Sequence, residues 1–249
     1  MIDIIKSETR GKANHGWLQS RHTFSFANYY NPARMGFSHL RVINDDTVQG
    51  GRGFDTHGHR DMEIISYVLE GEIEHQDNQG NKRRLPAGEF QLLSAGSGIK
   101  HSEYNANNSE SLNFLQIWIE PDVLNGKPSY QQKNFGQKWG LTKVISKNGD
   151  DGSLLIKQDA TLSQLFMRPN QHELVTIKQG HSVYVHVIAG EIKIDGQRLK
   201  AGDGANINKQ LKVDITSDSD NKVQALILVN QLSGISQELG RIFYNGFGE

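Results

Sequence analysis

The segment Val68-Leu69-Glu70-Gly71-Glu72-Ile73 decides the architecture, because it returns in the second half of the chain as Val187-Ile188-Ala189-Gly190-Glu191-Ile192. A second pair follows in the same order, since Leu85-Pro86-Ala87-Gly88-Glu89 is matched by Leu199-Lys200-Ala201-Gly202-Asp203. Each half therefore contains a strand, a turn centred on glycine, a return strand and a tight turn that opens the next strand. Similar hairpins recur by chance in β-proteins, but two matched turns in one order favour an internal duplication.

Short apolar runs dominate the rest of the chain and are bounded by clusters of turn-forming residues; examples are 36–43, 89–96, 112–120 and 223–230. Regular strands with this punctuation predict a sandwich or a barrel. Helical periodicity is weak, and only Ser236 to Arg241 is a candidate for a short helix. We therefore expect an all-β fold with two domains, residues 1–130 and 131–249, which meet where a polar stretch interrupts the strands.

Composition narrows the classes of function. The chain has 27 Lys and Arg against 28 Asp and Glu, so it offers no broad basic surface for nucleic acid or an anionic membrane. It has no cysteine, which leaves histidine and carboxylate as its metal ligands. The first residues lack the apolar core of a secretory signal, and no run reaches membrane-spanning length. These features predict a soluble cytoplasmic protein with a small or proteinaceous partner.

His57-Gly58-His59 is the sharpest local sign of chemistry. Alternate residues of a strand point to the same face, so this pair can offer two imidazoles to one ion. The spacing alone is weak evidence, because such pairs also arise by chance on surfaces. His101-Ser102-Glu103 repeats the same parity after a glycine-rich segment, so four candidate ligands come as two strand-borne pairs.

Glu63 is a rival carboxylate with the same face parity as His59. In an extended strand Glu63 would lie about 13 Å from His59, whereas Glu103 would lie only about 6.6 Å from His101. A bulge could bring Glu63 back toward the site, so we keep it as a residue that supports the ligands from behind. The alternative is an inward polar residue bonded to the barrel backbone.

An aromatic-rich stretch precedes the histidines; it contains Phe24, Phe26, Tyr29, Tyr30 and Phe37. Such residues can line a ligand slot or pack in the core and between domains. We expect packing.

Four ordered segments resemble the motif string of the pirin family; they are 22–26, 36–42, 57–64 and 94–103. The resemblance covers roughly residues 10–120, and the second half is recognisable mainly by its A-G-D turn. Pirins are bicupins, so the resemblance implies two tandem jelly-roll β-barrels, with a metal held in the first. It also implies that His57, His59, His101 and Glu103 hold one divalent metal, usually iron.

The second barrel is expected to lack a metal site. Carried across by the offsets of the repeat, the four ligand positions fall on Thr176, Lys178, Ile215 and Ser217. None of these preserves the ligand of the first barrel. The nearby histidines of the second half are interpreted as polar surface or turn residues; they are His172, His181 and His186.

Three neutral imidazoles and one carboxylate on a divalent ion leave a net charge of about +1, which suits anionic oxygen ligands and O₂. This donor set is compatible with Fe(II), Mn, Ni, Cu or Zn. Pirin-like bacterial proteins are similar to flavonol dioxygenases, so the resemblance implies oxidative opening of quercetin at the 2,3 bond with release of CO. In that reaction Glu103 tunes the metal and accepts the hydroxyl proton. The alternative is a regulatory or redox-sensing protein that acts by binding a protein partner.

Overall fold

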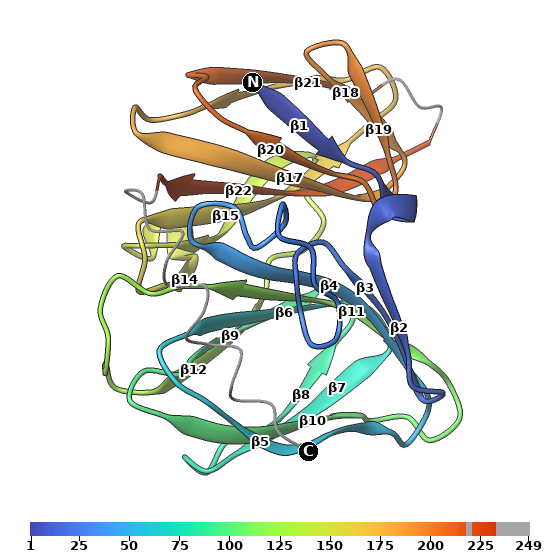
Figure 1. The fold of residues 1–249 in the computed structure, drawn as a ribbon, viewed down its shortest axis with the longest axis vertical. Helices are drawn as coiled ribbons and strands as arrows, with labels where there is room; N and C mark the ends of the chain where they lie inside the picture. The colour runs from blue at the N-terminus through green and yellow to red at the C-terminus, as the bar shows by residue number, and fades with distance from the viewer. Residues whose placement is uncertain (218–220, 233–249) are drawn as a thin grey trace.

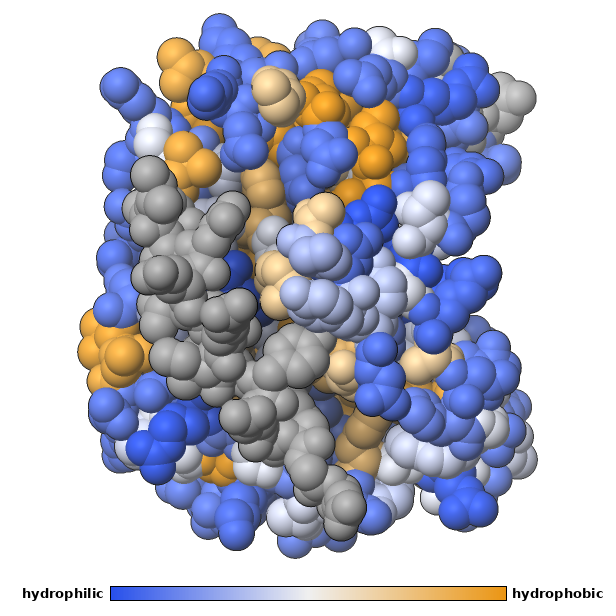
Figure 2. Space-filling view, in the orientation of Figure 1, coloured by the Kyte–Doolittle hydropathy of each residue, from blue (hydrophilic) through white to orange (hydrophobic). Residues whose placement is uncertain are grey.

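The computed structural model describes residues 1–217 and 221–232, which form two stacked β-barrels (Figure 1). The short helix expected at Ser236 to Arg241 lies outside these residues. The described residues contain two 3-10 turns, η1 (Ser7–Thr9) and η2 (Asp150–Gly152), and no helix long and apolar enough to cross a membrane. Figure 2 shows that hydrophilic residues cover most of one face, with hydrophobic residues gathered mainly on the upper barrel.

The first barrel joins a seven-stranded sheet to a four-stranded one. The larger sheet runs in the order β12 (Ser129–Asn134), β9 (Glu89–Ser94), β6 (Glu63–Glu70), β11 (Leu112–Ile119), β4 (Leu40–Val48), β3 (Leu18–His22) and β2 (Gly11–Asn14). The smaller runs β5 (Gly53–His59), β10 (Ile99–Asn105), β7 (Glu72–Asp77) and β8 (Lys82–Pro86).

The second barrel repeats this plan. Its larger sheet runs β1 (Ile2–Ile5), β20 (Gly204–Ile207), β17 (His181–Ala189), β22 (Val223–Gln231), β15 (Ala160–Met167), β13 (Gly140–Ser146) and β14 (Leu154–Leu155). Its smaller sheet runs β16 (His172–Thr176), β21 (Lys212–Ser217), β18 (Glu191–Ile194) and β19 (Gln197–Lys200). The all-β bicupin fold is therefore confirmed.

The repeated turns of the sequence occupy matching places in the two barrels. Gly71 and Gly190 stand between equivalent strands with φ of +83° and +76°. Gly88 and Gly202 open β9 and β20 with φ of +88° and +83°. Residues with a Cβ rarely adopt this left-handed backbone, so glycine at the four turns is what the duplicated hairpins require.

The barrels exchange strands across the predicted boundary. β1, the first strand of the chain, pairs antiparallel with β20 of the second barrel. β12 extends past residue 130 and pairs with β9 of the first barrel. Both exchanges tie the halves together, and the division at 130/131 stays a prediction.

One face of each large sheet packs against the other barrel. Tyr67 and Phe90 stack there at 4.0 Å between ring centroids, and Phe24 meets Tyr184 at 6.0 Å. Phe24 and Phe37 belong to this buried cluster, so the expectation of packing holds for these two aromatic residues. The opposite face of the first large sheet, together with the small sheet, encloses the space in which the candidate ligands lie.

Candidate metal centre

The pairing of β5 with β10 brings the candidate histidines together. His101 lies directly across from His57, and His59 lies opposite Ile99 at the end of the same ladder. The rings of His57, His59 and His101 are 4.5–5.0 Å apart between centroids. Their candidate ligand nitrogens all lie within 4.8 Å of one another. The spacing in sequence therefore becomes a cluster because two antiparallel strands present the same face.

Glu103 lies one inward position along β10 and belongs to an overlapping cluster with His75 and His101, again within 4.8 Å. Its carboxylate is buried and held by neutral donors. Ser66 Oγ donates to Oε1 at 3.1 Å, and Gln116 Nε2 donates to Oε2 at 2.9 Å. Gln91 Nε2 lies 3.4 Å from Oε1. Glu103 is thus fixed in orientation from behind.

The charge state of Glu103 follows from its neighbours. Burial would raise the pKa of this carboxyl, but the imidazoles of His101, His75 and His57 and the hydroxyl of Ser66 bring it below its usual value. The group therefore stays ionised at neutral pH. An ionised carboxylate is the form that binds a cation.

Burial has the opposite effect on the histidines. It lowers the pKa of His59 to about 3, with His101 and His57 adding to the shift. It lowers the pKa of His101 to about 4, although the carboxylate of Glu103 opposes the change. Both rings are neutral at pH 7, as metal ligation requires. In the described part of the chain the buried Nε2 of His101 has no hydrogen-bond partner, so this donor set fits a divalent metal.

A buried chain of hydrogen bonds fixes the proton on His101. The pKa of Asp77 is lowered by hydrogen bonds from Asn81, His75 and backbone amides against the effect of burial, so its carboxylate only accepts. His75 then donates from Nε2 to Asp77 Oδ2 at 3.1 Å. With a single ring proton, on Nε2, His75 keeps a lone pair on Nδ1, and this atom lies 3.5 Å from His101 Nδ1. His101 therefore carries its proton on Nδ1, and its Nε2 is free for a metal.

A cavity of about 730 Å³ opens onto the cluster, and His57, His59 and Glu103 are among its lining residues. One side is aromatic, with Trp118 5.0 Å from His59 and Trp17 5.4 Å from Phe54 between ring centroids. Phe26 and Tyr29 also line the cavity. The expectation that these two residues only pack is therefore wrong. Both residues lie in the loop between β3 and β4, and their spacing in the sequence gives no sign that they line a cavity.

Glu63 does not support the ligands. It shares the face of Ile65, which packs against the second barrel, whereas Ser66 faces the barrel interior. Its Oε2 accepts from Ser94 Oγ at 2.8 Å and from the backbone N–H of Lys157 at 3.3 Å. The prediction that Glu63 backs the candidate ligands is therefore wrong. The alternative of an inward polar residue bonded to the barrel backbone holds only in part, because Glu63 bonds to backbone but faces the second barrel.

Strand pairing corrects the alignment of the second barrel. Glu103 pairs with His75, whose repeat equivalent is Ile194, and Ile194 pairs with Ile215. Following the pairing along both strands, the equivalents of the four candidate ligands are Val175, Ile177, Val213 and Ile215. The sequence offsets were thus wrong by one residue on β16 and two on β21. All four are buried in the aliphatic core of the second barrel, which fills the space where the first barrel has its cluster.

The remaining histidines differ from one another. His172 is exposed and lies 2.6 Å from Asp214, as expected for a surface residue. His181 follows a turn at the start of β17 and lies 3.4 Å from Asp159, but its side chain is only 8% exposed. His186 is only 1% exposed and sits on β17 beside Tyr184. The surface interpretation is wrong for His186. Burial, together with Arg10, holds its pKa well below the usual value.

The sequence analysis missed the residues whose hydrogen bonds orient the candidate ligands; these are Ser66, His75, Asp77, Gln91 and Gln116. Their polar side chains face inward on strands that otherwise read as apolar. That parity is the only signal that points to them.

Comparisons with known proteins find relatives that match both halves of the chain. Residues 5–119 match the model of the family described as pirin, and residues 143–228 match the quercetinase C-terminal cupin domain. The quercetin 2,3-dioxygenase of Escherichia coli K12 is 48% identical over 90% of this chain and 96% of that protein. A pirin-like protein of Caulobacter vibrioides is 42% identical over 88% and 96%. The crystal structure of an Escherichia coli bacterial pirin, in complex with nickel(II), covers 94% of this chain and 100% of that one at a TM-score of 0.90 and 45% identity.

Proposed function

Because the chain belongs to the pirin family, we propose that it is a metal-dependent dioxygenase that opens the central ring of flavonols such as quercetin with O₂ and releases CO. His57, His59, His101 and Glu103 would hold the metal. The names of its relatives support a dioxygenase-type reaction, and the nickel complex of a relative supports a metal in this fold. Fe(II) remains the metal implied by the family resemblance, with Ni, Mn, Cu and Zn compatible with the donor set.

The observation that supports this proposal best is the position of the cluster in an aromatic-walled cavity. Its volume of about 730 Å³ falls in the range that encloses a small organic ligand. Trp118, Phe26 and Tyr29 give the cavity an aromatic wall, and the polar cluster lies beside them. Such a cavity favours a polycyclic phenol with one oxygen directed at the metal.

The chain's own groups divide the work as follows. A bound divalent metal would supply Lewis-acid polarisation of a substrate oxygen and electron exchange with O₂. His75 and Asp77 keep His101 in the tautomer that can bind it, and Ser66 and Gln116 keep Glu103 in place. The lowered pKa makes Glu103 a weak base, so we assign it mainly to charge balance and less to accepting the hydroxyl proton.

The test is aerobic incubation with quercetin of protein whose metal content has been measured, after separate loading with Fe(II), Ni(II), Mn(II), Cu(II) or Zn(II). We expect loss of the flavonol and release of CO in equal amounts with at least one metal. The variant H57A/H59A should do neither. H172A removes an exposed histidine of the second barrel and is the matched control. A filled site with no flavonol loss would contradict the proposal and favour the regulatory alternative.

A further inference from the structure

The cavity has a polar wall that the metal chemistry does not use. It comes from β3 and β4 of the large sheet, whereas the candidate ligands come from β5 and β10 of the small sheet. Ser20, His22, Asn44 and Asp46 are its members, and each is at most 5% exposed. Ser20 Oγ lies 3.3 Å from His22 Nδ1, which lies 2.8 Å from Asn44 Oδ1. The wall is therefore a connected network that ends at a carboxyl group.

Asp46 is the member whose hydrogen bonds are incomplete. Within the described residues its Oδ1 is sealed from solvent and has no hydrogen-bond partner. The hydroxyl of Ser20 favours the ionised carboxyl by a hydrogen bond. Because Oδ1 itself is sealed, a ligand reaches Asp46 only where the side chain lines the cavity. A hydroxyl bound there would offset part of the free-energy cost of burying a carboxyl with few hydrogen bonds.

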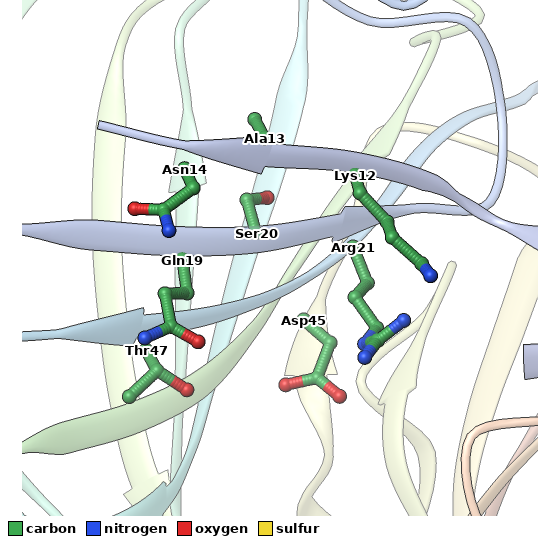
Figure 3. Close-up of a pocket in the computed structure, with 8 residues that line it drawn as sticks. All are labelled: Lys12, Ala13, Asn14, Gln19, Ser20, Arg21, Asp45 and Thr47. Atoms are coloured by element: carbon green, nitrogen blue, oxygen red, sulfur yellow. The ribbon is translucent and has the colours of Figure 1, made fainter. Parts of the chain in front are cut away.

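Asp46 also differs from the acid next to it in the chain. Asp45 points through the other face of β4, beside Arg21 and Lys12 in a smaller pocket of about 330 Å³ (Figure 3). Asn113 Nδ2 donates to Asp45 Oδ1 at 2.8 Å, so that carboxylate already has a partner. Two adjacent aspartates therefore offer a matched pair, one facing the cavity and one facing away.

The charged groups around Asp46 let it bind a hydroxyl in either form. Burial raises its pKa to about 7; Asp45 and Glu103 also raise it, and Ser20 and Arg10 oppose the rise. The carboxylate accepts a hydrogen bond from a hydroxyl, and the protonated acid donates one to it. A hydroxyl can therefore bind to either form, and it binds more strongly to the carboxylate, because a hydrogen bond to a charged acceptor is the stronger one.

We propose that Asp46 is a specificity-determining residue that hydrogen-bonds a hydroxyl group on an outer ring of the aromatic substrate, while a different oxygen of the same molecule faces the metal centre. This assignment rests on the proposed function. Among the described residues Asp46 is in neither of the two clusters that could hold a metal, so we assign it to the substrate and not to the metal. The cavity therefore selects polyhydroxylated ring systems over unsubstituted ones.

Two flavonols separate this role from a general effect. Quercetin carries hydroxyls on its outer rings, whereas 3-hydroxyflavone keeps only the hydroxyl next to the carbonyl. The metal-loaded wild type, D46N, D46A and D45N would each be titrated with both compounds without oxygen, following the flavonol spectrum. Melting temperature and metal content would verify that each variant is folded and loaded.

For quercetin we expect the Kd to rise roughly threefold to tenfold in D46N, which keeps a neutral acceptor, and more than about tenfold in D46A. For 3-hydroxyflavone all four proteins should agree within about twofold. D45N should match the wild type with both compounds. Unchanged quercetin binding in D46A, or equal losses for both flavonols, would overturn the assignment. A loaded wild type that binds neither flavonol would instead overturn the proposed function, and the assignment with it.

Discussion

Replacing Asp77 by Asn should release the metal by reversing the tautomer of His101. In the wild type, Asp77 Oδ2 accepts from His75 Nε2 and from Asn81 Nδ2, at 3.1 and 2.8 Å. In D77N, an amide nitrogen in the place of Oδ2 would face two hydrogen-bond donors, His75 Nε2 and Asn81 Nδ2. His75 would then have to accept at Nε2 and carry its proton on Nδ1, which faces His101 Nδ1. His101 would be driven to protonate Nε2, the nitrogen left free for a metal.

The magnitude follows from what such supporting contacts are worth. Loss of a hydrogen bond behind a ligand typically lowers metal affinity about 10–100-fold, which is roughly 1.4–2.7 kcal/mol. We expect D77N to bind Ni(II) about 10–100-fold more weakly than the wild type. Competition with a chelator of known affinity measures this difference. N81A is the matched control, because it removes one partner of the same carboxylate and leaves His75 in place. It should bind Ni(II) within about threefold of the wild type. If D77N, folded by its melting curve, binds Ni(II) as tightly as N81A, the tautomer argument is refuted.

Three further predictions concern the same barrel. The protein should hold one divalent metal per chain, and elemental analysis of H57A/H59A should find it gone; retention of a full equivalent would mean that the site lies elsewhere. E103Q should lose metal and any flavonol cleavage, whereas E63Q should keep both, because Glu63 faces the other barrel; the reverse pattern in paired metal and turnover assays would reject the choice of carboxylate. In metal-free protein the folded state binds the proton of Asp46 more tightly than the unfolded state does, because the pKa is raised from 3.8 to about 7. The free energy of unfolding of the wild type, measured by urea denaturation, should therefore fall relative to that of D46N as the pH rises through this interval, by up to about 4 kcal/mol. A difference that stays constant with pH would contradict this.

Local spacing was enough to identify the candidate ligands and the duplication. His57-Gly58-His59 and His101-Ser102-Glu103 have strand parity, and parity survives folding because alternate residues keep a common face. The paired turns at Gly71 and Gly190 require a left-handed backbone, which favours glycine at both positions. An alignment of the two halves of the sequence therefore shows matching glycines.

Features that depend on how strands pair could not be predicted from local spacing in the sequence. Glu63 has the parity of His59, but it lies on a different strand, and only the packing of the two barrels decides which face is inside. The alignment of the second barrel slipped because bulges and unequal loops change the count between strands, as at the register shift between His101 and Glu103. His75 and Asp46 gained their roles from neighbours that are distant in sequence.

The exchange of β1 into the second barrel sets an order of events for the growing polypeptide. During synthesis Ile2–Ile5 leaves the ribosome about 200 residues ahead of its partner Gly204–Ile207, a lead of roughly 10–40 s. The first barrel can close in that interval, but β1 then waits as an unpaired edge. The first barrel thus folds while β1, which precedes it in the sequence, still lacks β20, its partner in the second barrel.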